Sequence, residues 1–160
     1  NNFAHSAITD KVIKAFYKVY NNLGYGFLEK VYERAIVIEL EKAGLAFRTQ
    51  VPLRIYYEGK RVGKYIPDII IEDQVVLEIK AVSCLHPSHE DQLRNALKAS
   101  GMEVGLLVNF GIQPQIKRKV FSTEFKRSMQ PGMEKYDEIP RKMSHERSII
   151  TNPGNHNQSF

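Results

Sequence analysis

The chain has 160 residues, enough for one domain with a buried core, and its 42% hydrophobic and 26% charged residues are ordinary for a folded globular protein. No apolar run approaches the roughly 18 residues of a membrane span, so we expect no membrane segment. The single cysteine, Cys84, excludes an internal disulfide and a zinc site built from cysteines, and it fits a reducing cytoplasm. The net charge of +5 fits a polyanionic partner.

Two helices are expected at the start of the chain. Apolar residues recur at helical spacing over residues 7–22, and the segment ends in an Asn-Asn-Leu-Gly sequence that suits a helix terminus. A second helical stripe runs over residues 27–43, where Gly44 follows as the stop signal. A third helix is predicted over residues 88–99, with Gly101 as its C-terminal cap.

Segments rich in β-branched residues fill the space between these helices. Strands are expected at residues 46–57, with an irregularity at Pro52, and at 62–71, 75–81, 104–109 and the edge segment 117–121. The resulting order, α-α-β-β-β-α-β, predicts the α/β class, with helices packed on a mixed central sheet.

The composition changes after the last predicted strand. Residues 1–121 are expected to form the folded domain. Residues 122–160 are polar and rich in proline and glycine, and they are expected to be disordered or loosely docked, with a weak signal for a short helix over 140–150.

Three charged residues interrupt two otherwise apolar strands. Asp68 precedes Ile69-Ile70-Ile71, and Glu78 and Lys80 lie in Val75–Ala81. Strands that are apolar on both faces are normally buried on both faces. Charges are rarely found there unless they are paired or bind a metal.

The pairing register decides whether these charges meet. If Glu72-Asp73-Gln74 is a three-residue loop, Asp68 stands opposite Glu78, and Lys80 shares their face. Two opposed carboxylates repel, which favours a cation between them: the Lys80 ammonium is one, and a divalent metal is the natural second. A two-residue loop would instead scatter the three residues. The alternative interpretation is a structural ion pair of Lys80 with Glu78 or Asp68.

Pro67-Asp68 followed by Glu78-Ile79-Lys80 resembles the PD-(D/E)xK nuclease pattern. The segment Gly26–Tyr32, with the sequence Gly-Phe-Leu-Glu-Lys-Val-Tyr, resembles the signature of the GxxExxY family, a small and mostly prokaryotic branch of that superfamily. Residues 91–98 and 104–111 resemble the same family, so the resemblance covers about residues 7–121. It implies a restriction-endonuclease-like fold.

The resemblance also implies a metal-dependent nuclease that hydrolyses phosphodiester bonds in DNA, in repair, recombination or defence. Mg²⁺ or Mn²⁺ would be held by Asp68, Glu78, the Ile79 carbonyl and Glu29, with Lys80 orienting the attacking water. Gln92 resembles the glutamine of a Q-x-x-x-Y element that helps to position substrate. The tyrosine position of that element is Ala96 in this chain.

Basic and aromatic side chains around the three charges are candidates for contact with nucleic acid, and DNA is the expected partner. They are Arg54, Lys60, Arg61, Lys64, Arg94 and Tyr32. No pattern for base-specific recognition is present. The competing hypotheses on the same fold are a catalytically inactive nucleic-acid-binding module and a protein-interaction scaffold.

Overall fold

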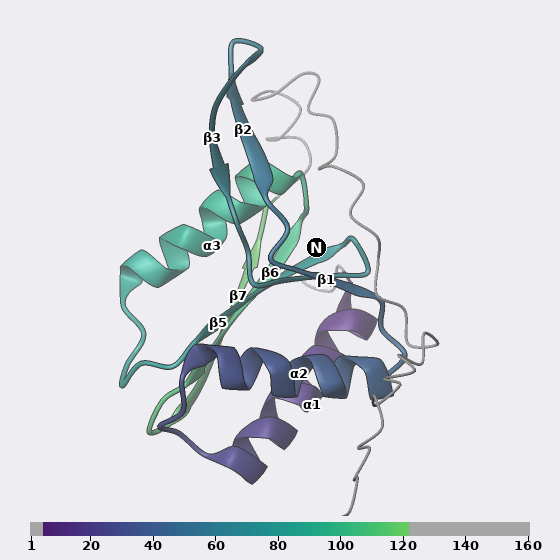
Figure 1. Ribbon diagram of the computed structural model, residues 1–160, viewed down its shortest axis with the longest axis vertical. Coiled ribbons are helices and arrows are strands. Elements are labelled where there is room, and N and C mark those ends of the chain that lie inside the picture. Colours follow the sequence, from purple (N-terminus) through teal and green to yellow (C-terminus); the bar gives the residue numbers. More distant parts are fainter. Residues whose placement is uncertain (1–4, 122–160) are drawn as a thin grey trace, which may run out of the picture.

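The fold is a layered arrangement of helices on a central sheet, seen in a computed structural model that describes residues 5–121 (Figure 1). Helices α1 (Ser6–Leu23) and α2 (Glu29–Lys42) lie on one side of the sheet, and α3 (Pro87–Ser100) lies on the other. The predicted helices are confirmed to within a few residues. Gly101 ends α3 with a φ of 68°, the left-handed conformation that glycine adopts without steric cost.

Five strands form the central sheet in the order β1-β4-β5-β6-β7, and two more form a separate antiparallel ribbon. The β5–β6 pair is parallel and its neighbours are antiparallel, so the sheet is mixed, as predicted. The strands are β1 (Phe47–Thr49), β2 (Leu53–Tyr57), β3 (Lys60–Tyr65), β4 (Ile69–Ile71), β5 (Val75–Lys80), β6 (Val104–Phe110) and β7 (Pro114–Val120).

Alternating residues of the central strands supply two separate cores. Ile69 and Leu77 pack with α1 and α2, whereas Ile70 and Val76 pack with α3. Because side chains alternate along a strand, Glu78 points to the same side of the sheet as Val76, and so does Lys80. The charges of β5 therefore project toward the α3 layer.

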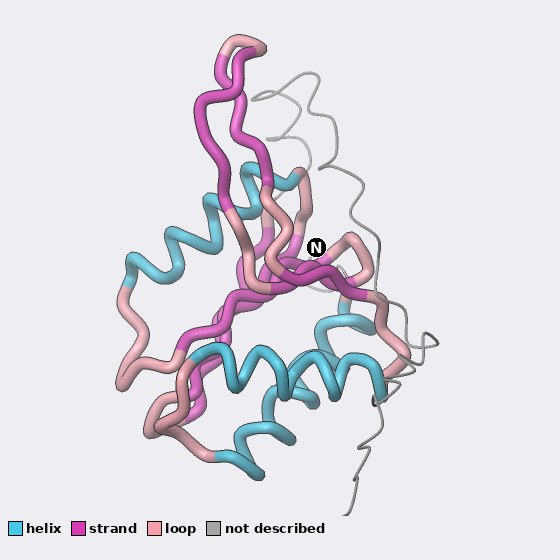
Figure 2. Tube along the Cα trace, in the orientation of Figure 1, coloured by secondary structure: helices cyan, strands magenta, loops and turns pink. Residues whose placement is uncertain are grey.

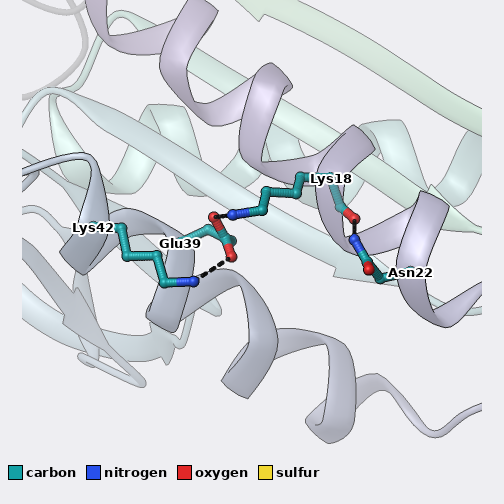
Figure 3. A network of polar contacts seen from close by, with 4 residues as sticks. All are labelled: Lys18, Asn22, Glu39 and Lys42. Carbon is teal, nitrogen blue, oxygen red and sulfur yellow. Dashed lines mark hydrogen bonds and ion pairs between the residues drawn. The ribbon is translucent and has the colours of Figure 1, made fainter.

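An ion-pair network joins α1 and α2 on the outside of the first layer (Figure 3). Lys18 Nζ lies 3.0 Å from one carboxylate oxygen of Glu39, and Lys42 Nζ lies 3.3 Å from the other. The hydrogen bond from Lys18, supported by Lys42, holds the pKa of Glu39 below its ordinary value despite partial burial. This network fixes the two helices together at a distance from the predicted site.

Two predicted strands are each broken in the structure, and this part of the prediction was wrong. Residues 46–57 divide into β1 and β2 around Gln50, whose φ of 55° is outside the range of an extended strand. Residues 62–71 divide into β3 and β4 at Ile66 and Pro67. As a result β2 and β3 leave the central sheet and form a two-stranded ribbon that extends beyond it (Figures 1 and 2).

The predicted polar tail, including the short helix signalled over 140–150, lies outside the described residues. Within residues 5–121, none of the helices combines the length and apolar character that a bilayer crossing requires.

Candidate active site

The predicted hairpin register is confirmed. Ile71 pairs with Val75 across a loop of three residues, two of which, Glu72 and Asp73, adopt left-handed φ values of 52° and 53°. Continuing that register one step beyond Ile69 and Leu77 brings Asp68 to Glu78. The odd number of loop residues therefore places both carboxylates on one side of the sheet, as the sequence predicted.

The Asp68 side chain is anchored to the backbone of β5. Its Oδ2 accepts a hydrogen bond of 2.7 Å from the Ile79 N–H, and its own carbonyl accepts one of 3.1 Å from Gln50 N–H. The N–H and C=O of a strand residue point to the same edge of the strand. The Ile79 carbonyl consequently faces the Asp68 side, beyond the last β4–β5 residue pair.

Glu78 is an acid in a dry environment, with 4% of its surface exposed. The Tyr65 hydroxyl donates to its Oε1 over 3.0 Å, and the Glu78 carboxyl also interacts with the Asp68 side chain. Burial, reinforced by the negative charge of Asp68, raises the pKa of Glu78 to about 8, although the Tyr65 hydrogen bond opposes the shift. Burial and the Glu78 charge also raise the pKa of Tyr65, so this phenol keeps its proton and remains the donor.

Lys80 lies half-buried at the end of β5, two residues beyond Glu78. Within residues 5–121 its ammonium forms no ion pair with Asp68 or Glu78. Its positive charge still lowers the pKa of Glu78. The structural ion pair considered from the sequence is therefore absent between these three residues, and the ammonium remains near the carboxylates without neutralising either one directly.

The donor set fits a hard divalent cation. Asp68 and Glu78 offer carboxylate oxygens, and the Ile79 carbonyl faces the same place. Among the described residues no cluster of three or more His, Cys, Asp or Glu side chains is arranged to hold a metal. Mg²⁺ is commonly bound through one or two carboxylates and keeps several waters, so a pair of acids with a carbonyl satisfies its requirements.

Neither Glu29 nor Gln92 forms a hydrogen bond or ion pair with Asp68 or Glu78 within residues 5–121. Glu29 is exposed in the first turn of α2. Burial, with the charges of Lys80 and His86, lowers the pKa of His89, while Glu29 acts in the opposite direction. Glu29 and Lys80 are therefore both close enough to His89 to affect it electrostatically. Gln92 follows His89 by about one helical turn on α3. These residues therefore gather at the same end of the sheet.

The structure also places Arg94 and Ala96, the two other α3 positions considered in the sequence analysis. Arg94 is exposed and forms an ion pair of 3.2 Å with Asp91. Ala96, at the tyrosine position of the Q-x-x-x-Y element, is fully buried against the sheet. The methyl group of Ala96 packs in the core.

Tyr32 was expected to contact nucleic acid, and the structure corrects this. Its exposed surface is 0%, its ring stacks on Phe110 at 4.0 Å, and its hydroxyl donates to the Gly24 carbonyl over 2.8 Å while accepting from Phe27 N–H. The tyrosine of the Gly26–Tyr32 signature thus closes the α1–α2 loop. Its function is to fix the position at which α2, and with it Glu29, begins.

Three residues that the sequence interpretation missed support the site. Tyr65 holds Glu78, and Gln50 links Asp68 to the buried Glu33 through a side-chain hydrogen bond of 3.1 Å. No local pattern marks either residue, because both act across a break between strands.

Asn109 is different, since a polar residue inside the apolar run of β6 was a visible signal. It pairs in register with Lys80, is fully buried, and bonds both the N–H and the C=O of Val82. It therefore fixes the chain immediately after Lys80.

A protein-family model described as the PD-(D/E)XK nuclease superfamily matches residues 6–120. The chain belongs to this superfamily. Its mixed sheet with helices on both faces is the restriction-endonuclease-like fold, and the superfamily consists of phosphodiester-cleaving nucleases that typically use a divalent metal.

Two solved structures are distantly similar. One is the crystal structure of SSO0001, with 19% identity and a TM-score of 0.45, covering 61% of this chain and 53% of that one. The chain thus spans about half the length of that protein. The other is Hjc, a Holliday junction resolvase from Archaeoglobus fulgidus, with 21% identity and a TM-score of 0.36, covering 56% of this chain and 73% of that one. No curated protein matches the sequence.

Proposed function

We propose that the chain is a divalent-metal-dependent nuclease of the GxxExxY branch that hydrolyses phosphodiester bonds in DNA, in repair, recombination or defence in a prokaryotic cytoplasm. The observation that carries the proposal is the buried Glu78 facing the half-buried Asp68, with Lys80 beside them. Two acids held side by side, one of them buried, with no ion pair to Lys80, are unfavourable for the fold itself. Their cost is explained if they serve a bound cation.

Each side chain has a distinct task in this proposal. Asp68, Glu78 and the Ile79 carbonyl hold Mg²⁺ or Mn²⁺, which when bound acidifies water and offsets charge on the scissile phosphate. Lys80, on the same side of the sheet, hydrogen-bonds the attacking water and stabilises negative charge that develops on the phosphate oxygens. Tyr65 orients the Glu78 carboxylate, and Glu29 and Gln92 position substrate or metal-bound water from α2 and α3.

Asp68→Asn provides the test of this assignment. The amide can still accept the hydrogen bond from Ile79 N–H, so the variant keeps the local fold but loses the negative charge. We expect the wild-type chain to cleave plasmid or oligonucleotide DNA with Mg²⁺ or Mn²⁺ and to stop when EDTA is added. The variant should be slower by about 10²-fold or more.

Gel-based cleavage assays and thermal melting of both proteins supply the measurements. Equal cleavage by wild type and a correctly folded Asp68→Asn protein would refute the catalytic role. Salt-dependent DNA binding without cleavage under any of these metals would instead support the inactive nucleic-acid-binding module.

A further inference from the structure

The β2–β3 ribbon (Leu53–Tyr65) is the most basic projecting part of the described chain. It carries four basic side chains and a single acidic one, Glu58, in a protein whose whole net charge is +5. Figure 1 shows it extending from the sheet past α3, with its turn at the outer end of the molecule. At that end Tyr57 and Val62 are 66% and 62% exposed, so the turn has no covering layer among residues 5–121.

The two faces of the ribbon differ in chemistry. Leu53, Ile55 and Tyr65 pack with the core on the α3 side. Cross-strand partners share a face, and neighbouring pairs point to opposite faces. The pair Arg54–Lys64 therefore lies on the face turned away from α3.

A β-bulge after Ile55 adds one residue on β3, and it puts Arg61 opposite Tyr56. Since Tyr56 follows Ile55, it points away from the core, as Arg54 does. We call the set Arg54, Tyr56, Arg61 and Lys64 the outer face of the ribbon.

The outer face is built at an electrostatic cost. Arg54 and Lys64 stand directly opposite each other, and like charges in that relation destabilise a strand pair. Within residues 5–121, Lys60, Arg61 and Lys64 form no ion pair. A polyanion bound along this face would pair with the Arg61 and Lys64 charges, and the phosphates of nucleic acid offer that complementary charge.

The ribbon is also connected to the candidate active site. Tyr65, the last residue of β3, donates to Glu78 over 3.0 Å from the core side, while the adjacent Lys64 faces outward. The position of the ribbon is thus coupled to the carboxylate pair through Tyr65.

From these observations we propose that the β2–β3 ribbon is a docking arm for double-stranded DNA, with Arg61 and Lys64 on backbone phosphates along a groove. This inference rests on the proposed nuclease function and names the form of its substrate. The major groove of B-form DNA is wide enough to admit a two-stranded ribbon, whereas that of an A-form RNA duplex is too deep and narrow for side chains to read. A single strand offers no groove for the ribbon to follow.

The test compares two double variants that lose the same charge. Arg61→Ala with Lys64→Ala alters the outer face, and Lys11→Ala with Lys14→Ala alters exposed positions of α1. Binding to a fluorescent duplex and to its single strand is measured in EDTA over a series of salt concentrations, so that cleavage plays no part. Circular dichroism checks that each variant is folded.

We expect the ribbon variant to bind the duplex about tenfold more weakly and to release about two fewer counterions in the salt dependence, while the α1 variant stays close to wild type. Duplex binding unchanged by the ribbon variant, or weakened equally by both variants, would overturn the inference. An equal loss for duplex and single strand would overturn the duplex assignment. Absence of cleavage with the expected binding pattern would refute only the nuclease function.

Discussion

Replacing Lys80 with methionine is expected to lower the rate of DNA cleavage by about 10²- to 10³-fold while leaving the protein folded. Methionine keeps a long, flexible side chain and removes the ammonium. Lys80 forms no ion pair with Asp68 or Glu78 within residues 5–121, so its removal breaks no ion pair of either carboxylate. The loss should therefore fall on the reaction, where the ammonium would stabilise developing negative charge, and only weakly on stability.

Single-turnover cleavage rates at saturating Mn²⁺ measure this effect. Lys14→Met, on the exposed side of α1, is the matched control because it makes the same substitution away from the site. Melting curves with and without Mn²⁺ should still show stabilisation of the Lys80 variant by metal, since the oxygen ligands remain. A Lys80→Met protein that cleaves DNA at the wild-type rate would show that the ammonium has no part in the chemistry.

Glu78→Gln is expected to make the metal-free protein more stable at pH 8, by up to about 4 kcal/mol, even though it removes a residue of the site. The folded state raises the pKa of Glu78 to about 8 from an ordinary value of 4.5. Between these two values the folded state holds a proton that the unfolded state has lost. The stability of the wild type should therefore decline as the pH rises from about 4.5 to 8, and the neutral amide avoids that decline.

Urea denaturation in EDTA at pH 5 and pH 8 tests this prediction. The difference between the variant and the wild type should be larger at pH 8 than at pH 5. Glu39→Gln serves as the control with the opposite sign, because Lys18 lowers the pKa of Glu39 and the charged form is the stabilising one. Added Mn²⁺ should stabilise the wild type and have little effect on Glu78→Gln. A Glu78→Gln protein that is less stable than wild type at both pH values would contradict a buried, electrostatically unfavourable acid.

The helices and the β4–β5 register could be predicted because local signals determine them. Apolar spacing and terminal glycines mark the three helices, and the three-residue loop Glu72–Gln74 fixes which residues of β4 and β5 face each other. The length of that loop is enough to bring Asp68 and Glu78 together, because a register counted back from it needs no information from the rest of the fold.

The ribbon could not be predicted in the same way. Pro52 marks an irregularity in the first segment, but nothing in the apolar pattern indicates that either segment divides into two strands that lie in different sheets. What separates them is tertiary packing, in which Leu53 and Tyr65 turn toward α3 instead of joining the central sheet. The contact of Tyr65 with Glu78 follows from that separation and was missed for the same reason.

The Gly26–Tyr32 signature shows a related limit. A sequence pattern indicates that Glu29 and Tyr32 belong to one unit, but not which of them faces solvent. In the structure Glu29 is exposed beside the site, while Tyr32 is enclosed by Phe110 and the α1–α2 loop. Glu29 is therefore available to take part in chemistry, whereas Tyr32 contributes to packing.

Crystals of the protein soaked in Mn²⁺ and measured at an anomalous-scattering wavelength would show whether Asp68 and Glu78 bind a divalent cation. A peak is expected between the carboxylates of Asp68 and Glu78, about 2.0–2.3 Å from an oxygen of each and from the Ile79 carbonyl, with waters completing the shell. The peak should be absent from Asp68→Asn crystals treated in the same way. Ordered density for both carboxylates with no manganese between them at saturating concentration would contradict a metal site at Asp68 and Glu78.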